Sequence, residues 1–146
     1  MTSDTRQPRS LLFACNMNSV RSPMAASLAA AMLGDAVHVE SAGVYEGAVD
    51  PFAEAVMAEI GHDISGHVAR AFDEADPAGF DLVVALTPEA QREAESRVAP
   101  ARVEFWAIDN PSETRGNREQ VMTAYRATRD ALKRRIAERF AAQAAG

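Results

Sequence analysis

Short apolar segments alternate along the chain with longer segments in which apolar residues recur every third or fourth position. The short segments are typical of buried strands and lie at residues 10–14, 37–42, 80–86 and 103–106. The longer segments predict helices at residues 22–33, 51–60, 88–98 and 118–142. Strands that alternate with helices favour a parallel α/β sheet, which binds ligands at the carboxyl ends of its strands.

Two of these helices begin with recognisable signals. Ser22 and Pro23 are expected to cap and open the first helix, and Thr87 and Pro88 are expected to do so for the third. The last predicted helix carries apolar residues on one face and charged residues on the other. We therefore expect it to lie across the sheet.

Composition limits the classes of protein that the chain can be. Its 146 residues suffice for one domain, which we place at residues 10–142 after a flexible N-terminal tail at residues 1–9. The net charge of −6 argues against a nucleic-acid partner. The single cysteine and the polar start of the chain fit a reducing cytoplasm, and no apolar run is long enough to cross a membrane. We expect a monomer or a weak homodimer.

The candidate chemistry lies directly after the first strand, where five residues separate Cys15 from Arg21. A loop of this length can curl so that its backbone N–H groups point inward and form an anion-binding nest at the start of a helix. The residues between the two are therefore expected to bind a phosphate group. They are Asn16, Met17, Asn18, Ser19 and Val20.

Cys15 and Arg21 fit the two roles that such a phosphate cradle needs. The planar guanidinium of Arg21 can bind two phosphate oxygens and stabilise the charge of the transition state. The same positive surroundings favour the thiolate of Cys15 as a nucleophile, with Ser22 donating a hydrogen bond to it. A lone cysteine at a strand end is more often a packed core residue, but Arg-Ser-Pro at this offset is rare by chance and favours the catalytic interpretation.

On these residues the sequence resembles the low-molecular-weight protein tyrosine phosphatase superfamily, which also contains the thioredoxin-type arsenate reductases. The shared signature is a cysteine followed, after five residues, by Arg-Ser-Pro. Further landmarks that look alike are Asn18, Ser41-Ala42-Gly43, the Asp50-Pro51 helix start, His67-Val68-Ala69-Arg70 and the strand at 80–86. The resemblance implies a four-stranded parallel sheet flanked by helices on both faces, with the phosphate loop after the first strand.

Two positions depart from the family pattern. Met17 stands where the loop usually has glycine, which the fold tolerates if this residue avoids positive φ. The family's catalytic acid is an aspartate immediately before a proline, and here that position is Asn110. An amide cannot protonate a leaving oxygen, so we predict that Asp109 supplies the proton, with Glu113 as a weaker substitute. The alternative for Asp109 is a turn aspartate that bonds nearby backbone N–H groups.

Two features resemble the arsenate reductase branch, namely the short connection at 44–49 and the stretch at 106–111 before a long charged helix. That branch passes oxidation along further cysteines. This chain has only Cys15, and Thr87 stands where the next cysteine would fall. Arsenate reduction would therefore need an external thiol such as glutathione or mycothiol.

The sequence thus predicts phosphomonoester hydrolysis through a cysteinyl-phosphate on Cys15. The resemblance implies a phosphotyrosine protein or a small aryl phosphate as substrate, and Tyr45 is the best candidate for stacking on the aryl group. The alternatives are arsenate reduction with an external thiol and a non-catalytic phosphoryl-binding module. The histidines lack metal-ligand spacing and no nucleotide loop is present, so we predict no metal and no cofactor, and we interpret His67 as a structural residue that bonds the backbone.

Overall fold

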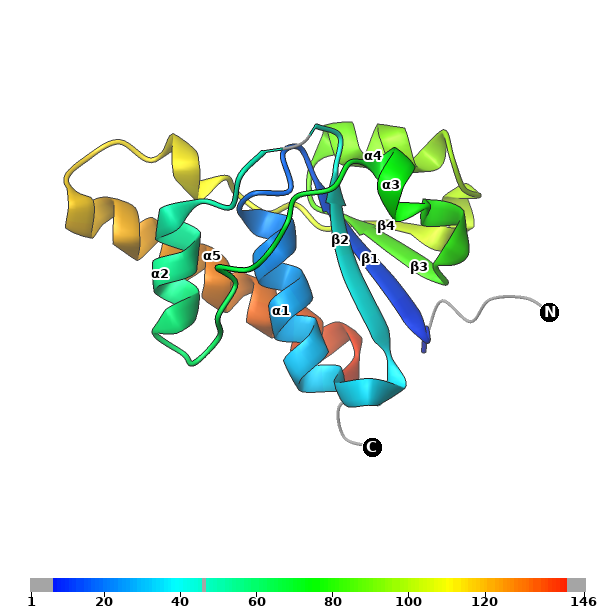
Figure 1. Cartoon of the computed structure of the whole chain (residues 1–146), viewed down its shortest axis with the longest axis horizontal. Helices are drawn as coiled ribbons and strands as arrows, with labels where there is room; N and C mark the ends of the chain where they lie inside the picture. Colours follow the sequence, from blue (N-terminus) through cyan, green and yellow to red (C-terminus); the bar gives the residue numbers. More distant parts are fainter. Residues whose placement is uncertain (1–6, 46, 142–146) are drawn as a thin grey trace.

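The computed structural model of the chain describes residues 7–45 and 47–141 and contains one parallel sheet (Figure 1). Its strands are β1 (Ser10–Cys15), β2 (His38–Gly43), β3 (Leu82–Ala85) and β4 (Val103–Phe105). They lie in the order β2-β1-β3-β4, and every neighbouring pair is parallel. The predicted four-stranded parallel sheet is confirmed, with β1 in its centre.

Helices cover both faces of this sheet, as the resemblance implied (Figure 1). They are α1 (Arg21–Leu33), α2 (Pro51–Ala58), α3 (Phe72–Ala75), α4 (Pro88–Glu95) and α5 (Arg118–Arg139). Short 3-10 turns occur at Gly34–Ala36, Pro77–Gly79, Pro100–Arg102 and Pro111–Glu113. Helices α1 and α5 lie on one face with α2 beside them, whereas α3 and α4 lie on the other. None of the helices in the described ranges is long and apolar enough to span a membrane.

The apolar run of β1 is continuous because the strand is buried on both faces. Leu11 and Phe13 belong to the core shared with α1, α2 and α5, whereas Leu12 and Ala14 belong to the core shared with α3 and α4. Trp106 packs edge-on against Phe13, with ring centroids 5.8 Å apart. The strand is therefore held from both sides, which fixes the position of Cys15 at its end.

Several local predictions need correction. Helix α1 begins at Arg21, so its N-cap is Val20 rather than the predicted Ser22, and Val20 makes no side-chain capping bond. The strand predicted at 80–86 contains only Leu82–Ala85 as β structure, and the helix predicted at 51–60 ends at Ala58. Thr87 does cap its helix as predicted, because its hydroxyl accepts a hydrogen bond from Ala90 N.

The ends of the chain bear on the predicted tail and domain limit. Of the tail at 1–9, residues 1–6 lie outside the described residues. Pro8 is buried, the N–H of Arg9 donates to Asp81, and its carbonyl accepts from the N–H of His38. Helix α5 ends at Arg139, and residue 142 also lies outside the described residues.

Candidate active site

The loop after β1 encloses a small pocket at the carboxyl edge of the sheet. Its volume is about 130 Å³. It is lined by Cys15, Asn16, Met17, Ser19, Val20, Arg21, Asn110 and Ser112. The structure thus brings the predicted nucleophile, the predicted arginine and most of the predicted binding residues to one place, of a size suited to a small oxyanion.

A chain of hydrogen bonds reaches Cys15 from behind the pocket. The Cys15 thiol is buried, and its Sγ lies 3.0 Å from Ser22 Oγ. Asn18 Nδ2 donates to the same hydroxyl at 2.8 Å, so Ser22 Oγ accepts there and keeps its own proton for another acceptor. The Ala42 carbonyl oxygen lies 3.4 Å from the Ser22 hydroxyl, so Cys15 Sγ is the nearer of these two neighbours. The single proton of the Ser22 hydroxyl is therefore placed to reach either Cys15 Sγ, the nearer acceptor, or the Ala42 carbonyl oxygen.

Asn18 is the anchor of the loop. It is fully buried and has a φ of 53°, a left-handed conformation that asparagine adopts more readily than most residues. Its Oδ1 accepts from the backbone N–H of Arg70 at 2.9 Å and lies 3.1 Å from His67 Nε2. Because Arg70 N can only donate, the amide orientation of Asn18 is fixed, and its Nδ2 must face Ser22.

His67 supports the loop, which confirms its structural interpretation. Its Nε2 lies 3.3 Å from the carbonyl oxygen of Asn18 as well as near the side-chain oxygen of that residue. Burial lowers the pKa of His67, and the nearby charge of Arg70 acts in the same direction. A neutral His67 that carries its proton on Nε2 satisfies both oxygens.

The backbone of the loop is free to bind an anion. Within the described ranges, none of the N–H groups from Asn16 to Arg21 donates to a protein acceptor. Met17 avoids positive φ, since Asn18 and Asp76 are the non-glycine residues in the described part of the chain that adopt it. Methionine therefore replaces the usual glycine without backbone strain.

Arg21 lies at the first turn of α1 and is held by the segment after β4. Its Nη1 donates to the carbonyl oxygen of Ile108 at 2.9 Å. Burial lowers the pKa of Arg21, whereas the charges of Cys15, Glu113 and Asp109 raise it. The guanidinium stays charged at any neutral pH, because arginine is not deprotonated in proteins. Among the described residues that line the pocket, it is the one fixed cation.

Two further residues position the loop, and the sequence analysis did not assign them this role. Thr87 Oγ1 donates to Asn16 Oδ1 at 2.7 Å, so the residue that replaces a cysteine of the arsenate reductase pattern braces the loop. The N–H of Asp50 donates to the carbonyl of Ser19 at 2.9 Å, and its carboxylate accepts from Tyr125 OH at 2.9 Å. The Asp50-Pro51 helix signal was the only indication of Asp50 in the sequence.

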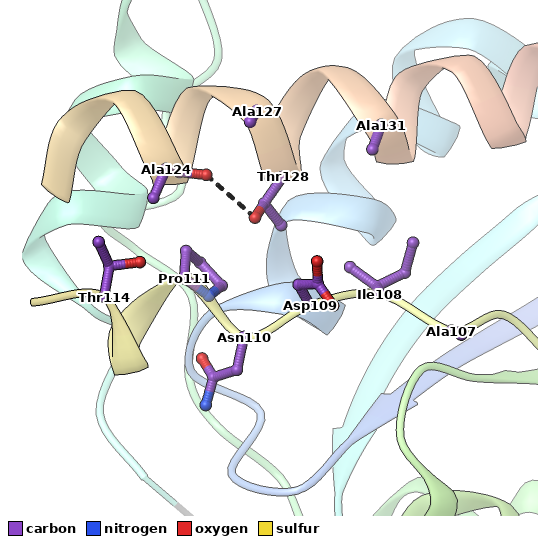
Figure 2. A pocket seen from close by; sticks show the side chains of 10 residues that line it. All are labelled: Ala107, Ile108, Asp109, Asn110, Pro111, Thr114, Ala124, Ala127, Thr128 and Ala131. Carbon is purple, nitrogen blue, oxygen red and sulfur yellow. Dashed lines mark hydrogen bonds between the residues drawn. The ribbon is translucent and has the colours of Figure 1, made fainter. Parts of the chain in front are cut away.

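The side chain of Asp109 does not lie where a catalytic acid must lie. The side chain of Asp109 turns toward α5, whereas that of Asn110 lies on the opposite side of the segment (Figure 2). Asn110 lines the Cys15 pocket and Asp109 does not. The side-chain oxygen of Asn110 accepts from the N–H and hydroxyl of Ser112 and caps the turn at Pro111–Glu113. The acid function of Asp109 stays a prediction, and it requires this segment to move.

Tyr45 is close to the loop, but its side chain does not line the pocket. Its N–H donates to the carbonyl of Asn16 at 2.7 Å, and its side chain is exposed. A hydrogen bond to the Glu89 carboxylate raises the pKa of Tyr45 and indicates that the phenol is turned toward α4. Stacking of Tyr45 on a substrate therefore also stays a prediction.

The fold and the pocket together define a parallel α/β protein with a buried cysteine and an arginine in the loop after its first strand. The family model described as "Low molecular weight phosphotyrosine protein phosphatase" matches residues 10–144. The chain belongs to this family, whose members are enzymes. The family predicted from the sequence is thus confirmed.

Relatives in this family carry two kinds of name. An arsenate reductase of Bacillus subtilis is 32% identical over 128 residues, which cover 88% of this chain and 92% of the relative. The solved structure of an arsenate reductase in its oxidized state is 25% identical and has a TM-score of 0.79, with 92% of this chain and 98% of that chain covered. The tyrosine phosphatase AmsI of Erwinia amylovora is similar in fold, at 22% identity, a TM-score of 0.75 and 93% of each chain covered.

Proposed function

We propose that the chain hydrolyses phosphate monoesters, with phosphotyrosine proteins or small aryl phosphates as substrates. The observation that carries this proposal is the position of Cys15 Sγ, which lies 3.0 Å from the Ser22 hydroxyl in a pocket lined by Arg21 and by a loop whose N–H groups have no acceptor among the described residues. A phosphoryl group in the pocket has its oxygens held by these donors and its phosphorus in line with the sulfur.

The reaction proceeds in two displacements. The Cys15 thiolate attacks phosphorus and forms a P–S bond, while the P–O bond to the alcohol or phenol breaks and the leaving oxygen takes up a proton. Water then attacks the cysteinyl-phosphate, which releases inorganic phosphate and returns the thiolate. Arg21 and the loop N–H groups stabilise the charge on the three equatorial oxygens in both steps.

The test is the hydrolysis of para-nitrophenyl phosphate and of a phosphotyrosine peptide, with rapid acid quenching to trap the phosphorylated enzyme. Cys15→Ser should abolish turnover while the fold and some phosphate affinity persist, because a serine hydroxyl is not ionised at neutral pH. Turnover near the wild-type rate in Cys15→Ser would exclude the covalent mechanism.

A second candidate function, arsenate reduction with an external thiol, is favoured by one observation. The pocket is lined by Asn110, which cannot protonate a leaving group, and arsenate does not need such an acid because the oxygen that leaves is one of its own hydroxyl groups, released as hydroxide or water. The relative from Bacillus subtilis named above as an arsenate reductase agrees with it. Since Cys15 is the only cysteine, both electrons must come from outside the chain, as two molecules of a small thiol become one disulfide.

The same enzyme preparation separates the two functions. Arsenite formation that requires added glutathione or mycothiol, together with negligible hydrolysis of aryl phosphate, would replace the phosphatase proposal by the reductase. Binding of phosphate with neither activity would instead indicate a phosphoryl-binding module.

A further inference from the structure

A second pocket lies on the other side of the segment that carries Asn110, between this segment and α5 (Figure 2). Its volume is about 410 Å³, which is within the range of small-molecule sites. It is lined by Ala107, Ile108, Asp109, Asn110, Pro111, Thr114, Ala124, Ala127, Thr128 and Ala131. Nothing in the proposed phosphatase or reductase chemistry uses this space.

The second pocket exists because the two sides of α5 carry side chains of different size. Tyr125, Leu132 and Ile136 fill the core, whereas the side that faces residues 107–114 has alanines and a threonine, which leave the space between them open. The walls are therefore mostly methyl groups. They suit a short aliphatic chain rather than a large polar molecule.

One charge faces this aliphatic space. The carboxylate of Asp109 turns into it (Figure 2), and with the residues that the structure describes it makes no hydrogen bond and no ion pair within 4 Å. The charge of Arg21 acts on Asp109 from the other side of the segment, but Arg21 Nη1 is occupied by Ile108 O. The Thr128 hydroxyl donates to the Ala124 carbonyl at 3.1 Å, so the lone pairs of its oxygen remain for a donor in the pocket.

We propose that this second pocket binds a small organic cation, a primary alkylammonium or alkylguanidinium. The cationic head donates to Asp109 Oδ1 or Oδ2 and to Thr128 Oγ1, and the alkyl chain lies on the methyl groups of Ala124, Ala127 and Ala131. The Asp109 carboxylate is exposed at the rim of the pocket, and it favours a cation over a neutral ligand because only a cation forms a charge-assisted hydrogen bond with it. The cation site does not rest on the proposed reaction on Cys15, and it uses Asp109 in its present position, whereas the predicted acid function of Asp109 requires the segment to move.

The experiment is a titration of the full chain with n-pentylammonium, followed by amide chemical shifts, with n-pentanol as the neutral match. We expect saturable shifts confined to residues 107–114 and 124–131 with the amine and about fivefold weaker binding of the alcohol. Asp109→Asn should weaken the amine by about fivefold, since the attraction of an exposed carboxylate for the cation is lost. Ala127→Leu should abolish binding by filling the space, at an exposed helix position where leucine is well tolerated.

Glu113→Gln is the matched control. It removes one negative charge four residues after Asp109, from an exposed side chain that does not line the second pocket. Its affinity for n-pentylammonium should equal that of the wild type. Equal losses in Asp109→Asn and Glu113→Gln would show a nonspecific charge effect, and unchanged binding in Asp109→Asn or Ala127→Leu would overturn the proposed site.

Discussion

Gly43 ends β2 against the phosphate loop, and replacement of this residue by alanine tests how tightly the loop is held. A Cβ at Gly43 would lie 2.6 Å from Tyr45 O, 2.7 Å from Asn18 N and 2.9 Å from Asn16 O. All three are backbone atoms, so rotation of a side chain cannot relieve the overlap. The loop itself must move, which alters the positions of its N–H groups.

Two opposing effects set the size of the change. Replacement of glycine by alanine restricts the unfolded chain and stabilises a fold by about 0.4–1 kcal/mol where the new methyl group fits. Overpacking in a tight region costs about 1–3 kcal/mol. We therefore expect Gly43→Ala to lower the free energy of unfolding by roughly 1–2 kcal/mol. Activity should suffer more, because a displacement of about 1 Å in a catalytic group can cost about 10²-fold in rate.

The assay is urea unfolding combined with para-nitrophenyl phosphate turnover, and Gly66→Ala is the matched control. A Cβ at Gly66 meets nothing within 4 Å, so this variant should be as stable as the wild type, or slightly more stable, and equally active. Gly43→Ala with the same stability and turnover as Gly66→Ala would show that the close backbone contacts at Gly43 do not hold the loop. If stability falls but turnover does not, the contact of Gly43 with the loop stabilises the fold without setting the positions of the catalytic groups.

Three further predictions concern the pocket and the pH dependence of stability. Arg21→Lys should reduce kcat/KM for aryl phosphate by roughly 10²-fold or more, because an ammonium cannot bind two oxygens in one plane. If Asp109 is the acid, Asp109→Asn should slow phenyl phosphate about 10²–10⁴-fold more than para-nitrophenyl phosphate; if the chain lacks an acid, Asn110→Asp should instead raise phenyl phosphate turnover. Hydrogen bonds to Arg126 and Arg129 lower the pKa of Glu59 from 4.5 to about 2 in the folded protein. The ionised carboxylate therefore stabilises the folded state above pH 4.5, and this stabilisation is lost as the pH falls toward about 2. The difference in unfolding midpoint between the wild type and Glu59→Gln should shrink over that same window.

Distinct outcomes would contradict each of these. Normal turnover by Arg21→Lys would mean that the guanidinium is not part of the phosphate site. Equal rates for the wild type and Asp109→Asn on both substrates, with a gain for Asn110→Asp, would reject Asp109 as the acid. A Glu59→Gln difference that persists unchanged at pH 2 would show that the carboxylate stabilises the fold by packing rather than by its charge.

The sheet and the phosphate loop were predictable because their signals are local in the sequence. The apolar run of β1 and the helical spacing after Pro23 lie on either side of the Cys15 loop, so the strand-loop-helix arrangement follows from neighbouring residues. The contact between the Ser22 hydroxyl and the Cys15 sulfur was also predicted. The predicted capping role of Ser22 was wrong because the N-cap is Val20, two residues earlier, and the Ser22 hydroxyl is instead bonded by Asn18 and placed against Cys15.

The supports of the loop were less predictable, because they join residues far apart in the chain. Arg70 N and His67 bond Asn18 across about fifty positions, and Thr87 bonds Asn16 across a still longer separation. Periodicity and capping rules describe contacts within one element and do not report these. The side-chain directions of Asp109 and Asn110 were inaccessible for another reason, since a segment without regular structure has no period that assigns faces.

The burial of one thiol beneath the loop also determines how the protein responds to oxidants. A peroxide that enters the Cys15 pocket would convert the thiolate to a sulfenic acid, and the protective step that follows in many proteins is condensation with a nearby second thiol. This chain has no other cysteine, so it cannot form an internal disulfide. Recovery then depends on a small thiol that diffuses in from solution, and without one a second oxidation makes the loss permanent. The activity of the protein would thus follow the thiol supply of its surroundings.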